Sequence, residues 1–129
     1  MRNLKEYSPT IIRITISLVF LWFGINQMFN HSYFIGYLPG WVGALPFEAS
    51  TFLIINGVVE TILGTLLLIG LFTRLTALIL AVHLFGITLS LGYNDIAVRD
   101  LGLTLVTFAI FLYGPDRFTL DEKRKSKKA

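Results

Sequence analysis

The chain has 129 residues and a net charge of +3; 54% of its residues are hydrophobic and only 15% are charged, with a mean hydropathy of +0.70. Soluble domains carry about 25% charged residues, so the composition excludes an ordinary soluble domain and predicts an integral membrane protein. The lack of cysteine excludes disulfides and thiolate-bound clusters, and two histidines, His31 and His83, are too few for most metal sites.

Four apolar segments follow one another along the chain, at residues 10–29, 51–71, 73–91 and 96–113. About 20 such residues span a bilayer core as a helix. The first segment is too long for a signal-peptide core and lacks a small-residue cleavage site, so we expect it to be retained. The connection at residues 70–73 predicts that the second and third helices form a tight antiparallel hairpin, and Gly114-Pro115 ends the fourth. We therefore predict an all-α, up-down antiparallel bundle of four transmembrane helices in one domain, residues 1–121.

Basic residues set the expected orientation. All but one lie on one side of the predicted bundle: Arg2, Lys5, Arg13, Arg74, Arg117 and the basic tail at residues 122–129, with Arg99 alone on the other side. Both termini are thus predicted to be cytoplasmic, in a multi-pass protein of a prokaryotic cytoplasmic membrane. The tail favours contact with anionic lipid over a soluble partner, and its position argues against nucleic acid. Arg13 lies one turn inside its helix, which snorkelling of the side chain explains.

The segment at residues 31–50 contains no Lys or Arg and is predicted to lie outside. It carries five aromatic residues, Tyr33, Phe34, Tyr37, Trp41 and Phe47. Such rings favour the headgroup layer, so we interpret the segment as an interfacial anchor in preference to a lid over an outward-facing site.

Small and polar residues recur at spacings of three and four, which place them on one face of each helix. The stripes are Arg13, Ser17, Phe20, Gly24, Gln27 and His31; Asn56, Gly57, Glu60, Thr61 and Gly64; Thr76, Ile79, His83, Gly86 and Ser90; and Asp100, Thr104, Thr107 and Phe111. Membrane helices associate through small residues and interhelical hydrogen bonds, so the stripes predict a compact bundle with a polar axis. Packing alone accounts for every stripe without a ligand.

Glu60 is the only charged residue between Glu48 and Arg74. A charge at the bilayer centre costs about 2.5–3.5 kcal/mol on insertion scales, so such a residue usually faces the bundle interior and often has a function. Glu60 and His83 lie about equally far from the turn at Leu71 and Phe72, so we predict that they meet near the bilayer midplane as candidate catalytic residues. The pair could relay protons or bind a polar head group, or it could only fix the helix register.

A second polar group lies toward the predicted outer face, with Tyr93 and Asn94 nearby. It comprises Asn26 and four candidate ligands for a cofactor: Asn56, Gln27, Arg99 and Asp100. A helix that began only at Asp100 would be short for a crossing. We therefore expect the fourth helix to begin soon after Asn94, which draws Arg99 and Asp100 into the membrane, with Glu60 and Asn56 as candidate partners.

The chain resembles the DoxX family of small four-helix membrane proteins over residues 13–121. The resemblance is carried by Arg13 with residues 20–24, by Glu60 with residues 64–74, and by residues 99–101 leading to residues 114–121. Family members often have a lysine near the position of Gln27, and this chain departs from them there. The resemblance implies membership of a quinone-linked redox system, because the family name derives from a subunit of a thiosulfate- or quinol-oxidising complex.

Three functions are consistent with these features. The first is a membrane subunit of a quinone-linked oxidoreductase, in which Glu60, His83 and Asn56 serve a quinone and a redox partner protein supplies electrons. The second is a small proton-coupled transporter with Glu60 as its ionisable group, and the third is a scaffold or assembly subunit without chemistry. No resident cofactor is evident beyond the quinone, and the sequence leaves the oligomeric state open.

Overall fold

The computed structural model describes residues 2–30, 43, 44, 46, 48–91 and 95–128. Within this part the chain is all-α, as predicted, and its helices are α1 Arg2–Phe29, α3 Ala49–Ile69, α4 Thr73–Leu91, α5 Asp95–Tyr113 and α6 Leu120–Lys128. The predicted second, third and fourth helices are confirmed to within two residues at each end. The first begins at Arg2 instead of Thr10 and contains Pro9. The predicted basic tail lies largely in α6.

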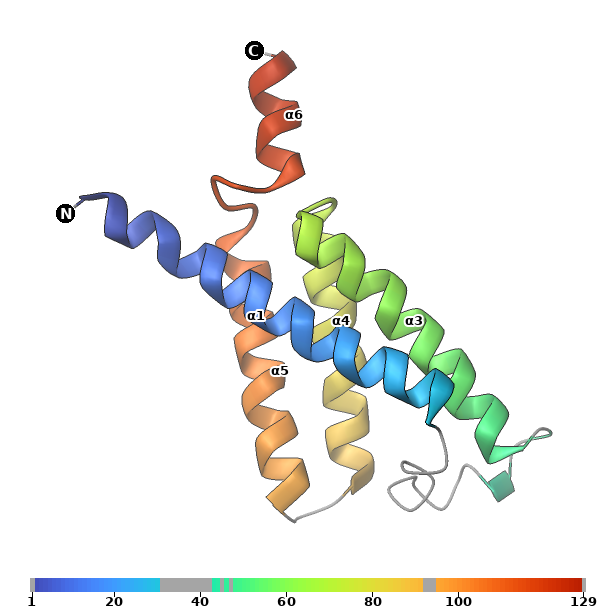
Figure 1. Cartoon of the computed structure of the whole chain (residues 1–129). Helices are drawn as coiled ribbons and strands as arrows, with labels where there is room; N and C mark the ends of the chain where they lie inside the picture. The colour runs from blue at the N-terminus through green and yellow to red at the C-terminus, as the bar shows by residue number, and fades with distance from the viewer. Residues whose placement is uncertain (1, 31–42, 45, 47, 92–94, 129) are drawn as a thin grey trace.

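The four main helices pack as two antiparallel pairs. α1 runs along α3, and α4 runs along α5, whereas α3 touches α4 and α1 touches α5 over much smaller areas. Figure 1 shows the α1–α3 pair lying obliquely across the upright α4–α5 pair. The predicted hairpin of the second and third helices is therefore confirmed in part: the connection is as short as expected and α3 touches α4, but each of them packs mainly against another helix. The turn reverses the chain, but it does not set the angle at which α3 and α4 leave it.

The two ends of the bundle differ in construction (Figure 1). The turn end contains the start of α1, the α3–α4 turn, the end of α5 and α6, and the loop end contains the end of α1 and the start of α5. At the turn end, Gly70 caps α3 with a left-handed φ of 76°, and its N–H donates to the carbonyl oxygens of Leu66 and Leu67. Phe72 follows with a φ of 52°, which is strained for a bulky residue.

Length and hydropathy suit the helices to a bilayer. Apolar stretches of 26, 20 and 19 residues lie in α1, α3 and α5, and α4 contributes a shorter one, Thr73–Leu89. Many large apolar side chains point outward, among them Leu105, which is 60% exposed, and Val82, which is 64% exposed. In water such a surface would be costly, whereas acyl chains cover it without penalty. The chain is thus built as a multi-pass membrane protein.

The predicted stripes on α1, α3 and α5 face the interior, as their largely buried residues show. The stripe on α4 is partly wrong, because Ile79 is 42% exposed and Gly86 is also exposed. The buried face of α4 is instead centred on Ala77 and Leu80, which are fully buried. His31 and the five aromatic residues of the segment 31–50 lie outside the described residues.

Candidate functional site

Four side chains from three helices meet in what we call the amide–carboxylate cluster. Its members are Gln27 of α1, Asn56 and Glu60 of α3, and His83 of α4. Asn56 Nδ2 donates to Gln27 Oε1 at 2.6 Å and to Glu60 Oε1 at 3.1 Å. Gln27 Nε2 donates to Glu60 Oε2 at 3.4 Å. Both carboxylate oxygens of Glu60 therefore accept a hydrogen bond from an amide.

Close contact between α1 and α3 makes this cluster possible. A Cβ added to Gly24 would lie 2.6 Å from Thr61 Oγ1, and one added to Gly57 would lie 2.6 Å from the carbonyl oxygen of Gly24. Only glycine lets two helix backbones approach so closely. The pair of glycines thus brings Gln27 within reach of the α3 carboxylate.

Glu60 is only 3% exposed, and His83 Nε2 lies 3.4 Å from its Oε1 atom. The contact is within ion-pair range, but it does not have hydrogen-bond geometry: Nε2 is buried and has no hydrogen-bond partner among the described residues. The rest of the imidazole is more open, because the His83 side chain is 28% exposed.

The predicted meeting of Glu60 and His83 is confirmed, and Asn56 and Gln27 join them. α5 also begins at Asp95, early enough to include Arg99 and Asp100, as expected. The expected contacts of these two residues with Glu60 and Asn56 are wrong.

Arg99 and Asp100 pair with each other instead. Arg99 Nε lies 3.4 Å from Asp100 Oδ1, and the guanidinium also lies over the ring of Phe23 of α1. Asp100 is buried, whereas the Arg99 side chain is 54% exposed. Because they are neighbours on one helix, this pair needs no other helix to form.

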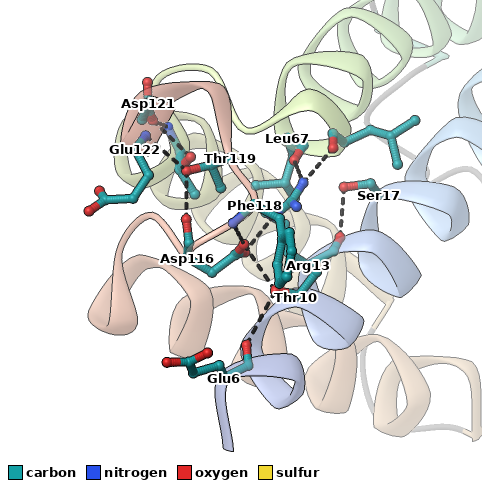
Figure 2. Close-up of polar contacts among 12 residues, drawn as sticks. Glu6, Thr10, Arg13, Ser17, Leu67, Asp116, Phe118, Thr119, Asp121 and Glu122 are labelled. Atoms are coloured by element: carbon teal, nitrogen blue, oxygen red, sulfur yellow. Dashed lines mark hydrogen bonds and ion pairs between the residues drawn. The ribbon is translucent and has the colours of Figure 1, made fainter. Parts of the chain in front are cut away.

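A second polar centre lies at the turn end, and we call it the Arg13–Asp116 junction. Arg13 Nε donates to Asp116 Oδ2 at 2.6 Å, and Arg13 Nη1 donates to the carbonyl oxygens of Leu67, at 3.0 Å, and Leu68. Asp116 Oδ1 accepts from Thr10 Oγ1 and from the backbone N–H of Phe118, both at 3.0 Å. Figure 2 shows Arg13 between Asp116 and the last turn of α3. A positive charge at a helix C-terminus is favourable, because unpaired carbonyl groups lie there.

Arg13 is 2% exposed, so the interpretation of this residue as a snorkelling side chain is wrong. Asp116, its partner, was not predicted from the sequence. The available signal was charge complementarity, since the orientation rule puts both residues on the same side of the membrane. Snorkelling is a rule for isolated side chains, and it took no account of a carboxylate 103 residues away.

Asp121 extends the junction to α4. Its carboxylate accepts from the N–H groups of Phe72 at 2.9 Å and Thr73 at 2.7 Å, and from Thr73 Oγ1 at 2.8 Å. Its own N–H donates to the carbonyl oxygen of Gly70 at 3.0 Å. Partial burial raises the pKa of Asp121, but hydrogen bonds from Thr73 and Phe72 and the nearby charge of Arg124 outweigh it and hold the pKa below 3.8, its ordinary value. The segment after α5 is thus tied to both helix pairs.

Comparison with known proteins identifies the family. Residues 8–92 match the DoxX family. The chain is also 35% identical to the uncharacterized membrane protein Rv3486 of Mycobacterium tuberculosis (strain ATCC 25618 / H37Rv), over 96% of this chain and 86% of the relative. No solved structure shows a significant match. Because the family match covers more than half of the chain and includes Arg13, Glu60 and His83, the protein is a member of the DoxX family of membrane proteins.

Proposed function

We propose that this protein is an integral membrane subunit of a quinone-linked redox system, and that the amide–carboxylate cluster receives the quinone head group. The observation that carries the proposal is the buried Nε2 atom of His83, which lacks a hydrogen-bond partner among the described residues beside a buried carboxylate. Nearly all buried polar atoms in proteins are hydrogen-bonded. An unpaired one next to an ionisable group is therefore a reason to expect a ligand.

The residues of the cluster fit a quinone. A quinone head group presents carbonyl oxygens that accept hydrogen bonds. Nε2 of a protonated His83 can donate one, and no described residue accepts it. The apolar outer surface of the helices suits the isoprenoid tail. Asn56 and Gln27 already use their amides to hold Glu60 in place.

A bound quinone supplies two-electron, two-proton redox chemistry. Glu60 holds a proton at its carboxyl group in reserve: once Nε2 of His83 has given up its hydrogen, this carboxyl group, 3.4 Å away, can supply another. Asn56 and Gln27 fix the orientation of the carboxylate and lower the cost of burying it. We place the electron donor on a redox partner protein.

For the same system we propose that α1, α3, α4 and α5 all cross a prokaryotic cytoplasmic membrane with the turn end in the cytoplasm. The 19 residues of α4 would extend about 28 Å, close to the hydrocarbon thickness of about 30 Å. Lys5, Arg74, Arg117 and the basic residues of α6 support this orientation, because they belong to the turn end, whereas Arg99 lies toward the loop end.

A binding experiment tests the proposal. The protein is purified into nanodiscs, extracted to measure quinone that co-purifies, and titrated with decylubiquinone by calorimetry against empty nanodiscs. We expect Glu60→Gln and His83→Leu each to weaken binding by about 1.5–3 kcal/mol, the range for hydrogen bonds that involve charged groups. The matched control is Asn26→Ala, beside Gln27 but, among the described residues, bonded within α1 and to Asn30 and not to the cluster.

Other results would favour the other candidate functions. Binding that is absent, or equal in all variants, contradicts the quinone proposal. Substrate uptake into proteoliposomes that requires a pH gradient and is lost in Glu60→Gln would indicate a transporter. Loss of stability or of partner recovery alone would indicate a scaffold.

A further inference from the structure

We infer that Glu60 exchanges protons with the loop end of the bundle only, and that an apolar layer seals it from the turn end. The inference rests on the proposed role of the amide–carboxylate cluster in proton exchange, and it adds the side of the membrane that supplies the proton. It follows from the order in which polar and apolar groups are stacked along the bundle.

An apolar layer separates the amide–carboxylate cluster from the Arg13–Asp116 junction. Its buried members come from all four main helices: Ile16, Phe20, Leu67, Ala77, Leu80, Leu84 and Ile110. On α1 the order is Gln27, Phe20, Ile16 and Arg13, so two layer residues stand between the two polar centres. Leu63, Leu103 and Phe111 pack against the layer and widen it. Tightly packed apolar side chains exclude the water that a proton would need.

Hydroxyl groups at the same depth do not bridge this layer. Ser17 Oγ donates to the carbonyl oxygen of Arg13, and Thr107 Oγ1 donates to that of Leu103, both at 2.7 Å. Ser17 and Thr107 are fully buried. Each hydroxyl is thus committed to the backbone of its own helix and does not donate toward Glu60.

The Arg13–Asp116 junction closes the turn end behind the layer. The Arg13 side chain is 3% exposed and that of Asp116 2%. Both Asp116 carboxylate oxygens and the Leu67 carbonyl oxygen accept hydrogen bonds within the junction. The charged groups of the junction thus bond to one another and to the end of α3.

Polar groups continue from Glu60 toward the loop end. Asn56 lies one helical turn nearer that end of α3, is only half-buried and bonds directly to the carboxylate. At the end of α1, Asn26 is half-buried and Asn30 is exposed, and they bond to each other at 3.0 Å. On α5, Asp100 and Arg99 lie in the half of the helix nearest the loop end. Polar side chains of this kind support water and proton transfer inside a membrane protein.

Single-cysteine variants can test the inference directly, because the chain contains no cysteine. Gln27→Cys and Asn56→Cys report on the cluster, and Ser17→Cys, which lies between Ile16 and Phe20, reports on the apolar layer itself with almost no change in side-chain size. Lys123→Cys marks the turn end and calibrates the orientation of the reconstituted protein. Each variant is placed in sealed vesicles and treated with a small, membrane-impermeant methanethiosulfonate on one side at a time.

We expect Gln27→Cys and Asn56→Cys to react from the side opposite to Lys123→Cys, at least an order of magnitude faster than from the same side. Ser17→Cys should react with reagent added on the loop-end side no faster than a fully buried cysteine does. Reaction of either cluster variant from the Lys123 side, from both sides or from neither side would overturn the inference. Helical content and elution volume must match those of the unsubstituted protein. If either cluster variant misfolds, the unsubstituted protein is used instead. Its infrared carboxyl band is followed after a pH jump on one side of the vesicle membrane, and Glu60→Gln identifies the part of the band that belongs to Glu60.

These outcomes are separate from those of the quinone experiment. Thiol labelling needs no quinone, so one-sided access can hold while decylubiquinone binding fails. Binding can equally hold while access proves to be two-sided, in which case only the present inference is lost.

Discussion

Arg13 and Asp116 form a buried ion pair that joins the first membrane helix to the segment after the last one, with Arg13 Nε 2.6 Å from Asp116 Oδ2. Breaking a buried pair by removing one partner costs about 3–5 kcal/mol, because a charge remains without compensation. We expect Asp116→Ala to lower the free energy of unfolding by about this amount. Unfolding in mixed detergent micelles, followed by circular dichroism, measures it.

The exposed pair of Arg117 and Glu6, at 2.6 Å, provides the control. Exposed ion pairs contribute about 0–1 kcal/mol, so Glu6→Gln should change stability little. Equal losses in Asp116→Ala and Glu6→Gln would show that burial does not strengthen the Arg13 contact.

The close approach of α1 and α3 gives a second prediction. Gly24→Ala places a methyl group 2.9 Å from the Gly57 carbonyl oxygen, which cannot move aside without shifting the helix. Overpacking of this kind typically costs about 1–3 kcal/mol, and it should also break the contact of Gln27 with Glu60. Gly102→Ala is the control, because its added Cβ meets nothing within 4 Å. Thermal unfolding in detergent should show a loss for Gly24→Ala and no loss for Gly102→Ala.

The third prediction is that the Asp121 carboxylate makes the stability of the protein depend on pH. Its pKa in the folded state is lowered from 3.8, so folding favours the charged form. The stability it contributes is present above pH 3.8 and is lost as the pH falls through the lower, folded-state pKa. Asp121→Asn should therefore be less stable than the unsubstituted protein at neutral pH, and the difference should shrink at low pH. Unfolding at a series of pH values measures this, and a difference that grows toward low pH would contradict it.

Gln27, which bonds to Glu60, gives a fourth prediction. A lysine ammonium at this position could pair with Glu60, so Gln27→Lys should keep the bundle stable. Gln27→Leu removes a donor from the buried carboxylate and should cost about 1–3 kcal/mol. Detergent unfolding of the two variants compares them, with Asn26→Leu as the neighbouring control. A greater loss for lysine than for leucine would show that the site does not accept a positive charge.

Local sequence signals predicted the helices well, because each signal acts over a few residues. The lengths of the apolar runs, Gly70 and Gly114-Pro115 placed most helix ends within two residues. The start of α1 was misplaced because Pro9 and the charges before it resemble a boundary, whereas the helix continues through them.

Contacts between helices could be predicted only where depth alone decides them. Glu60 and His83 meet because equal distances from a short turn give equal depths. Depth does not fix the angle between helices or their rotation, so the pairing of α1 with α3 and the outward position of Ile79 were not predictable in this way. The Arg13–Asp116 contact requires both a crossing angle and the path of the chain after α5.

The spacing of Arg13 and Asp116 along the chain has a consequence for biosynthesis. Arg13 belongs to α1, but its counter-ion is synthesised 103 residues later, after α3, α4 and α5. The nascent chain therefore carries an uncompensated cation until the segment that follows α5 has been made. A chain truncated after Tyr113 would lack Asp116 and would leave the Arg13 charge without a counter-ion. We expect membrane quality control to degrade such a chain.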